Sequence, residues 1–369
     1  MLSLKQTVVL NGVPRMKLLV LPCDGIGPEI SQSTTEFAMT AAEKVGLEVE
    51  FHEDDVGFSS LEKYGTTLRD TLLESAIHDF DGVILGPQSH LDYPPVAEGG
   101  RNVSGGFRIG LDLYANIRPA ISRPFLPNNA SGMDLVIYRE NTEGFYPDRN
   151  MYQGVGEMMP DPDIALSIRK ITRRCCMRIC KQAFLAAASR GKKIAAVHKA
   201  NSFLMTDGLF LECFREVARE FPDIETEELI VDAFAALLVR QPEKYDIVVT
   251  TNFYGDILSD LASELSGSLG LAGSINANAE KGLCMAQAQH GSAPDIAGQD
   301  RANPCSLMLS VAMMFEWIGR SKNNEKAIET AVLMTEAIDS VLKNQSQRTP
   351  DLGGELGTQE FTRCLISAL

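Results

Sequence analysis

Short apolar runs suited to β-strands alternate with helical patterns along most of this chain of 369 residues. The strand-like runs are 17–21, 47–51, 82–85, 133–138, 194–198, 229–231 and 247–250. Helical patterns occupy 68–80, 164–188, 206–220, 233–240 and 255–265, and Pro28 suits the first turn of another helix. Because parallel strands need long crossovers, this alternation predicts an α/β fold with a largely parallel sheet.

The remaining regions are expected to differ from this pattern. Residues 303–319, 325–342 and 358–368 are predicted to be helices. The Gly- and Pro-rich stretch 91–106 is expected to be an exposed functional loop, and the irregular stretch 147–163 an arm used in assembly.

The charge balance restricts the partners. Lys and Arg number 34 against 49 Asp and Glu, which gives a formal net charge of −15. Such an excess of acids opposes nucleic-acid binding and repels an anionic membrane face, so neither partner is expected. An anionic substrate then requires a local cationic pocket. The 8 cysteines contain no C-x-x-C pair and are predicted to be reduced and buried, with no zinc site.

The opening residues 1–17 lack the long apolar segment and the small-residue cleavage site of a secretory signal. No apolar stretch in the sequence is long enough to span a bilayer. A cytoplasmic location is therefore predicted.

A glycine pair at Gly25-Ile26-Gly27 follows the first strand and precedes a helix. It is not the G-x-G-x-x-G dinucleotide fingerprint, because the third glycine is missing. The pattern fits a structural tight turn and also a turn that faces a ligand.

Arginines form a stronger signal. Arg108 and Arg118 flank a strand-like segment, and Arg139 ends the run 133–138. Guanidinium groups bind carboxylates through paired hydrogen bonds, so three of them at strand ends suit a di- or tricarboxylate. Surface ion pairs are the alternative explanation for each arginine taken alone.

Two aspartates stand four residues apart in NFYGDILSD. This spacing places Asp256 and Asp260 on one face of a helix, where their like charges repel each other unless a cation joins them. Mg²⁺ or Mn²⁺ is the natural partner of such oxygen ligands. A capping aspartate beside a solvated one is the alternative.

Several single residues could also take part in chemistry. Lys199 ends a buried strand and is a candidate general base, and Tyr146 is a candidate proton donor. His290 opens the loop HGSAPDIAG, in which Asp295 could accept from a ribose hydroxyl. A solvated lysine, a core tyrosine and a plain turn are the alternatives.

Taken together and in order, these motifs resemble the isocitrate/isopropylmalate dehydrogenase family of β-decarboxylating dehydrogenases. The resembling segments are DGIGPEI (24–30), LDLYANIRP (111–119), DLVIYRENTEG (134–144), VHKAN (197–201), LIVDA (229–233), NFYGDILSDLASEL (252–265), HGSAPDIAGQDRANP (290–304) and RTPDLGG (348–354). The resemblance implies two α/β domains with mixed, largely parallel sheets and no Rossmann fold. Residues 1–111 and 267–369 would form a large cofactor-binding domain, and 112–266 a small domain with the metal site and the dimer interface.

The resemblance also implies roles for individual residues. The substrate would be bound by Arg108, Arg118, Arg139, Asn102 and Ser104. The metal ligands would be Asp256, Asp260 and Asp232 of the partner subunit. Tyr146 and Lys199 of the partner subunit would be the acid/base pair. The cofactor would be bound by Ile26, His290, Gly291, Ser292, Ala293, Asp295, Ile296 and Asn303. A homodimer, or a dimer of dimers, with shared active sites is expected.

The implied reaction is the oxidative decarboxylation of a 3-substituted (R)-malate with NAD and Mg²⁺ or Mn²⁺. Asp295 favours NAD, since a carboxylate there would repel the 2′-phosphate of NADP. Ser104 and Gly105, together with RENTEG at 139–144, favour a small or polar 3-substituent. An isocitrate- or homoisocitrate-like substrate is expected first, 3-isopropylmalate second, and tartrate or D-malate third. A catalytically silent regulatory subunit and a plain anion-binding α/β protein are the remaining alternatives.

Overall fold

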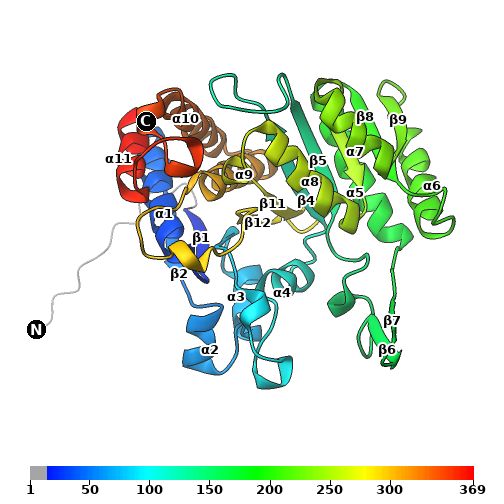
Figure 1. Cartoon of the computed structure of the whole chain (residues 1–369). Helices are drawn as coiled ribbons and strands as arrows, with labels where there is room; N and C mark the ends of the chain where they lie inside the picture. Colours follow the sequence, from blue (N-terminus) through cyan, green and yellow to red (C-terminus); the bar gives the residue numbers. More distant parts are fainter. Residues whose placement is uncertain (1–14) are drawn as a thin grey trace, which may run out of the picture.

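The computed structural model describes residues 15–369, so the prediction made on the first residues lies largely outside the described part. One 10-stranded sheet runs through the molecule in the order β2-β1-β3-β12-β11-β4-β5-β10-β8-β9 (Figure 1). Its strands are β1 (Met16–Leu21), β2 (Val49–Glu53), β3 (Gly82–Leu85), β4 (Ala115–Ile121), β5 (Asp134–Glu140), β8 (Lys193–His198), β9 (Glu225–Ile230), β10 (Ile247–Thr250), β11 (Ile275–Asn278) and β12 (Leu283–Gln287). Neighbouring strands are parallel in both outer parts of this sheet. The four middle strands, β12-β11-β4-β5, pair antiparallel with one another.

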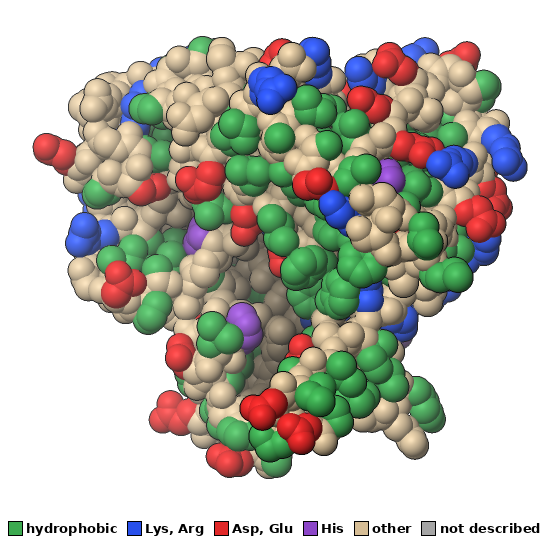
Figure 2. Space-filling view, turned by 45° about the vertical axis from the view of Figure 1, so that its right-hand side comes forward, with side chains coloured by type: hydrophobic (Ala, Val, Ile, Leu, Met, Phe, Trp, Pro, Cys, Tyr) green, Lys and Arg blue, Asp and Glu red, His purple; other side chains and the backbone are tan. Residues whose placement is uncertain are grey.

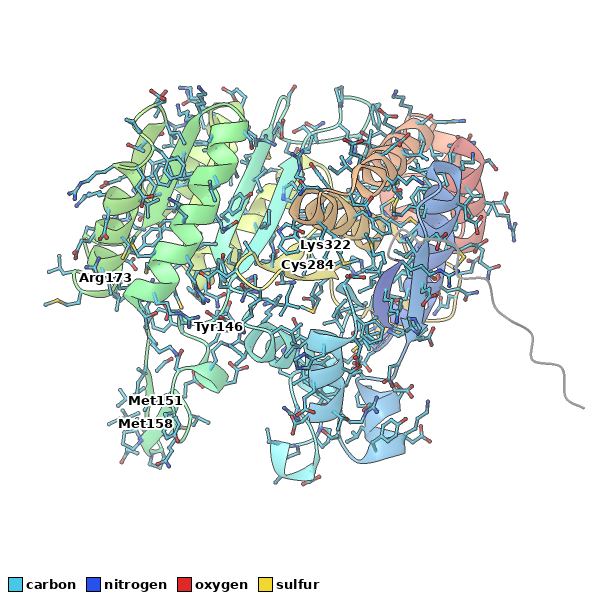
Figure 3. All side chains as sticks on the ribbon, turned by 180° about the vertical axis from the view of Figure 1, so that it is seen from behind. Tyr146, Met151, Met158, Arg173, Cys284 and Lys322 are labelled. Atoms are coloured by element: carbon cyan, nitrogen blue, oxygen red, sulfur yellow. The ribbon has the colours of Figure 1, made fainter. Side chains whose placement is uncertain are left out.

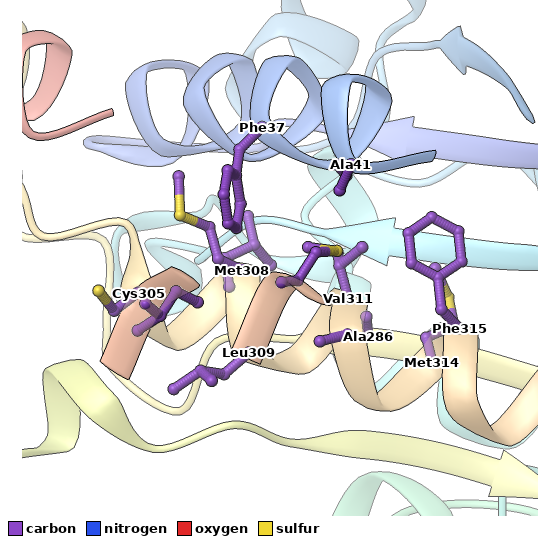
Figure 4. Packing of buried hydrophobic residues seen from close by; sticks show 14 of the residues in the cluster. Phe37, Ala41, Ala286, Cys305, Met308, Leu309, Val311, Met314 and Phe315 are labelled. Atoms are coloured by element: carbon purple, nitrogen blue, oxygen red, sulfur yellow. The ribbon is translucent and has the colours of Figure 1, made fainter. Parts of the chain in front are cut away.

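Helices cover both faces of this sheet. They are α1 (Gly27–Val45), α2 (Phe58–Tyr64), α3 (Asp70–His78), α4 (Val103–Gly110), α5 (Arg173–Ser189), α6 (Thr206–Ala218), α7 (Val231–Arg240), α8 (Asn252–Ser266), α9 (Cys305–Lys322), α10 (Glu325–Leu342) and α11 (Thr358–Ala368). The largest apolar cluster joins α1, α9, α10 and α11 to the β1 side of the sheet. In it Phe37 of α1 packs with Met308 of α9 (Figure 4). Separate apolar clusters hold α5 and α6 on one face of the other half, and α7 and α8 on the opposite face.

Buried asparagines join the two halves where the strand direction changes. Asn116 of β4 donates to the side-chain oxygen of Asn276 of β11 at 3.2 Å, and Asn141 donates to the same oxygen at 2.8 Å. Each of these amides is fully buried. Because a buried amide without partners is costly, these contacts fix the register of β4 against β11.

A two-stranded hairpin, β6 (Glu157–Asp161) and β7 (Ile164–Ser167), projects from the body (Figures 1 and 3). The helix predicted from 164 to 188 is therefore wrong in its first part. Helix α5 begins at Arg173, where the Thr172 side chain accepts from the backbone N–H of Cys175. The exposed loop predicted over 91–106 ends early as well, because Asn102 caps α4 from Val103 onward.

The predicted α/β class with a mixed, largely parallel sheet is confirmed. In residues 15–369 no helix combines the length and apolar character needed to cross a membrane. The sheet is continuous from β2 to β9, and the proposed division at 111/112 and 266/267 remains a prediction.

Candidate active site

Arg118 and Arg139 contact Asp256 and Asp260 beside β5. At this strand the antiparallel middle of the sheet meets its second parallel part. Arg139 of β5 lies opposite Asn116 of β4, so Arg118 is its diagonal neighbour on the same face. Strand β10 is paired with β5 and ends at Thr250, and α8 starts at Asn252. The first turns of α8 therefore pass over the two arginines.

The side chains are in direct contact. Arg139 pairs with Asp256 and donates to the Tyr146 hydroxyl at 2.9 Å, and this hydroxyl donates to Asp256 Oδ2 at 2.8 Å. Arg118 lies 3.1 Å from Asp260 Oδ1 and 3.6 Å from Asp256 Oδ1. In the view from behind, Tyr146 lies nearer the middle of the molecule than Met151 and Met158, which lie in the projecting part that includes β6 (Figure 3). Figure 2 shows a hollow on one face, between the body and the parts that project below it.

The backbone of α8 passes close to Arg139 at Gly255. A Cβ added at Gly255 would lie 2.6 Å from Cγ of Arg139, closer than real contacts allow. Asn252 accepts from Nε of Arg139 at 2.8 Å and fixes the plane of the guanidinium. Gly255 and Asn252 thus position Arg139.

Burial and neighbouring charges together set the pKa values of the side chains in this cluster. Burial and the nearby Arg139 lower the pKa of Arg118 to about 10. Burial by itself would raise the pKa of Asp256, but Arg139 and Arg118 outweigh it and lower the value to about 2. Burial raises the pKa of Asp260 and raises that of Tyr146 to about 12. At neutral pH the site therefore holds an ionised Asp256 beside a protonated tyrosine.

Helix α4 supplies a second set of polar groups. Arg108 and Ser104 both donate to the side-chain oxygen of Gln287, at 3.2 and 3.0 Å. Asn102 accepts from the backbone N–H of Gly105 at 2.9 Å, so its oxygen serves as the helix cap. Burial and the positive charges of Arg139 and Arg118 lower the pKa of Arg108.

Lys199 and Asp232 lie elsewhere. Strands β8 and β9 are parallel neighbours, so the residues that follow them meet at one edge, and Lys199 pairs with Asp232 there. Among residues 15–369, no hydrogen bond or ion pair joins either side chain to Asp256 or Asp260. The two predicted parts of the catalytic set are thus separate within one chain.

The predicted cofactor residues gather around the loop after β12. The backbone N–H of Ile26 donates to the carbonyl of Ser292 at 2.8 Å, which ties the Gly25–Gly27 turn to this loop. Ala293 has a φ of 38°, so the chain turns sharply before Asp295 and Ile296 in the 3₁₀ turn Pro294–Ile296.

His290 and Asn303 complete this region. The Nε2 atom of His290 is buried and has no hydrogen-bond partner among the described residues, and burial lowers the pKa of the ring. Asn303 donates to Asp351 at 2.9 Å, beside the RTPDLGG segment. An orphaned ring nitrogen beside the exposed Gly291 suits a bound nucleotide.

Two aspartates of α8 are the carboxylates that could hold a divalent ion. In the described part of the chain no three His, Cys, Asp or Glu side chains come close enough to hold an ion. Asp256 and Asp260 offer two carboxylates one helical turn apart, half-exposed at 41% and 51%. Two hard oxygen donors on one helix face fit Mg²⁺ or Mn²⁺, which bind one or two protein carboxylates and fill their other positions with water or substrate oxygens.

Sequence reasoning missed several residues of the site. Gln287, Asn252 and Arg149 all contact or adjoin the groups described above. Arg149 had a usable signal, since it follows the candidate Tyr146 by three positions. Asn252 also had one, since it opens the motif NFYGDILSD, whereas Gln287 had none, because its partners come from a distant segment.

The family described as isocitrate/isopropylmalate dehydrogenase matches residues 17–365 of the chain. The chain belongs to this family. The resemblance drawn from the motifs is thereby confirmed, and the chain is an oxidatively decarboxylating dehydrogenase of a class that uses NAD or NADP and a divalent metal.

Relatives with different substrates are equally similar. The chain is 39% identical to the NAD isocitrate dehydrogenase catalytic subunit 5 of Arabidopsis thaliana mitochondria, over 95% of this chain and 87% of the relative. It is 38% identical to the isocitrate/homoisocitrate dehydrogenase of Thermus thermophilus, over 96% and 98%. A 3-isopropylmalate dehydrogenase of Sulfurisphaera tokodaii is also 38% identical, over 94% and 97%. The crystal structure of isocitrate dehydrogenase from Methylococcus capsulatus superposes with a TM-score of 0.82 at 38% identity, over 96% of this chain and 99% of that one.

Proposed function

We propose that this chain catalyses the NAD- and divalent-metal-dependent oxidative decarboxylation of a 3-substituted (R)-malate with an isocitrate- or homoisocitrate-like substituent. The observation that carries the proposal is the contact set Arg118, Arg139, Tyr146 and Asp256 in one cluster. Guanidinium groups beside two half-exposed carboxylates suit an anionic substrate together with a divalent cation. This argument also disfavours a silent regulatory subunit, because the whole predicted set is present.

The proposed site residues bind and orient the substrate. Arg108, Arg118 and Arg139 bind its carboxylates, and Asn102 and Ser104 face its 3-substituent. Asp256 and Asp260, with Asp232 of the partner subunit, would hold a divalent metal. When bound, that ion would supply Lewis acidity at the C2 oxygen of the substrate.

Proton transfers fall to two side chains. Lys199 of the partner subunit accepts the proton of the C2 hydroxyl as a hydride leaves C2 for the nicotinamide. The 2-keto acid has a carboxylate β to its carbonyl and loses CO₂. Tyr146 then delivers a proton to C3. Its raised pKa, about 12, supports this role because the hydroxyl is protonated at neutral pH.

The cofactor loop supports NAD over NADP. Ile26, Gly291, Ser292, Ala293 and Ile296 would line the nucleotide, with His290 and Asn303. Asp295 would accept from the ribose 2′-hydroxyl and would repel a 2′-phosphate. The measurement is kcat/KM with each cofactor, and equal or higher efficiency with NADP would overturn this part.

The separate Lys199–Asp232 pair supports a homodimer or a dimer of dimers with shared sites. A cytoplasmic location, expected from the sequence, is part of the same proposal and is checked by cell fractionation.

A panel of 3-substituted malates tests the proposal. NADH and CO₂ are followed with isocitrate, homoisocitrate, 3-isopropylmalate, tartrate and D-malate in the presence of Mg²⁺ or Mn²⁺. We expect the highest kcat/KM with isocitrate or homoisocitrate. Selective turnover of 3-isopropylmalate would establish the second candidate, which the similar S. tokodaii enzyme favours. The absence of turnover with every substrate would reject the proposal.

A further inference from the structure

One buried arginine beside the site has no role in the reaction proposed above. The Arg149 side chain is only 4% exposed, whereas its partner Asp148 is 45% exposed. Nε and Nη2 of Arg149 donate to the two carboxylate oxygens of Asp148 at 2.8 and 2.9 Å. A buried guanidinium is thus paired with the carboxylate of its own neighbour, and that carboxylate still faces solvent.

The position of this pair is well defined. The Arg149 guanidinium carbon lies 5.0 Å from the centre of the Tyr146 ring, and that of Arg139 lies 5.7 Å from the same ring. A Cβ added at Gly105 would lie 2.9 Å from Nη2 of Arg149 and 3.2 Å from Oδ2 of Asp148. The pair therefore lies between Tyr146 and the first turn of α4, where Asn102 also lies.

The backbone of this arginine is also held in place. The Lys170 ammonium donates to the Arg149 carbonyl at 3.0 Å, and the next residue, Asn150, donates to the carbonyl of Gly144 at 2.8 Å. The guanidinium is therefore presented by an anchored segment, so little conformational entropy is lost when it binds a ligand.

The number of buried arginines in the site indicates which kind of ligand Arg149 binds. All substrates of the proposed reaction share the two carboxylates of malate and differ only in the group on C3. Arg108, Arg118 and Arg139 are enough for two carboxylates. A fourth buried guanidinium exceeds what a dicarboxylate needs and matches a third carboxylate. Asp148 can turn into solvent while the incoming carboxylate takes its place, so the buried guanidinium keeps an anionic partner throughout.

We propose, on the basis of the function proposed above, that Arg149 is a specificity-determining residue that binds a carboxylate on the C3 substituent. Asp148 occupies the same guanidinium when no such substituent is bound. A carboxymethyl or carboxyethyl group on C3 is then preferred over an isopropyl group, a hydroxyl group or hydrogen.

The first test is a ratio of specificity constants. We compare kcat/KM for isocitrate with kcat/KM for (R)-malate, which lacks the C3 substituent, in the wild type, Arg149→Met, Arg149→Lys and Arg320→Met. Arg320 is an exposed arginine of α9 and serves as the matched control. The ratio should fall about 100-fold in Arg149→Met, recover in part in Arg149→Lys and stay at the wild-type value in Arg320→Met. An unchanged ratio in Arg149→Met, including an equal loss on both substrates through a displaced Tyr146, would overturn the proposal.

The second test separates this inference from the proposed reaction. Calorimetry measures the binding of tricarballylate and succinate, which are unreactive tri- and dicarboxylates, without NAD. Arg149→Met should reduce the preference for tricarballylate about 100-fold. Asp148→Asn should tighten tricarballylate several-fold, because the competing carboxylate is gone. Weaker binding in Asp148→Asn, or an unchanged preference in Arg149→Met, contradicts the role of Arg149 whether or not the enzyme turns over substituted malates.

Discussion

The two parts of the predicted catalytic set are built differently. Arg118, Arg139, Tyr146 and Asp256 come from neighbouring elements of one chain and satisfy each other by direct contacts. Lys199 and Asp232 contact each other at the edge formed by β8 and β9, where the Asp232 side chain is 68% exposed.

Exposed apolar side chains also occur in this half of the molecule. Met205 follows Lys199 by six positions, Phe253 and Ile257 lie on α8, and all three side chains are exposed. Large apolar side chains left exposed are candidates for an interface. The contacts of the substrate part are thus completed within one chain, whereas the exposed Lys199–Asp232 pair agrees with the proposal that a second copy of the chain uses it.

The sharpest test of this comparison mixes two inactive variants. Lys199→Met and Asp256→Asn should each reduce kcat by at least about 1,000-fold, because one removes the base and the other a metal ligand. When the two are unfolded and refolded together, mixed dimers contain one intact shared site. Activity should return to about a quarter of the wild-type value for random pairing. No recovery, with mixed dimers verified by mass spectrometry, would show that each site lies within one chain.

Removal of the metal should abolish activity, because the proposed metal site draws on both parts. EDTA should abolish turnover, and Mg²⁺ or Mn²⁺ should restore it, because two carboxylates of α8 belong to the proposed metal site. Asp260→Asn should raise the metal concentration for half-maximal activity about tenfold or more. Glu62→Gln, an exposed change on α2, is the control. Full activity in EDTA would contradict the assignment of Asp256 and Asp260.

A charge placed among the exposed apolar side chains of α8 should weaken the proposed dimer without unfolding the chain. Ile257→Lys places a charge on the exposed side of α8, where the wild-type side chain is 55% exposed. We expect the dimer Kd to rise about 100-fold, with activity that falls on dilution and a circular dichroism spectrum like that of the wild type. Val332→Lys on α10, at an exposed position in the other half, is the matched control. An active monomer would contradict the shared site.

The smallest expected effect concerns a buried carboxyl behind the site. Burial and the neighbouring Glu140 raise the pKa of Glu143 to about 7 from its ordinary value of 4.5. The folded state then binds this proton more tightly than the unfolded state. Protonated Glu143 therefore adds to the free energy of unfolding below pH 4.5, and this stabilisation is lost as the pH rises to about 7.

Glu143→Gln should remove this loss of stability at rising pH. Urea unfolding at several pH values should show the variant gaining on the wild type by roughly 1–2 kcal/mol between the two ends of that window. Glu62→Gln should keep the wild-type profile. Parallel profiles for the wild type and Glu143→Gln would contradict the raised pKa.

Much of the fold could be predicted from local patterns. The predicted runs 82–85, 247–250, 325–342 and 358–368 coincide with β3, β10, α10 and α11. The two strands are uninterrupted apolar runs, and α10 is capped by the Asn324 side chain. Strands β6 and β7 were missed because every residue in them is exposed, so no buried face imposes an alternation.

The site could be predicted only as far as its motifs extend. The motif order indicated the arginines, aspartates and tyrosine, and their mutual contacts emerge from the register of β4, β5 and β10. Arg149 lies outside these motifs; its place three residues after Tyr146 was the one local signal, and its contact with Gly105, which lies far away in sequence, could not be predicted. Tertiary proximity of this kind is not visible in local composition.

The continuous sheet has a mechanical consequence. The segments that carry Arg108 and Arg139 are connected through β11 and β4, and the buried amides of Asn116 and Asn276 tie these two strands together. Ladder hydrogen bonds, rather than a flexible linker, therefore join the two halves of the sheet. A movement of one half relative to the other has to change the twist of the strands at this junction.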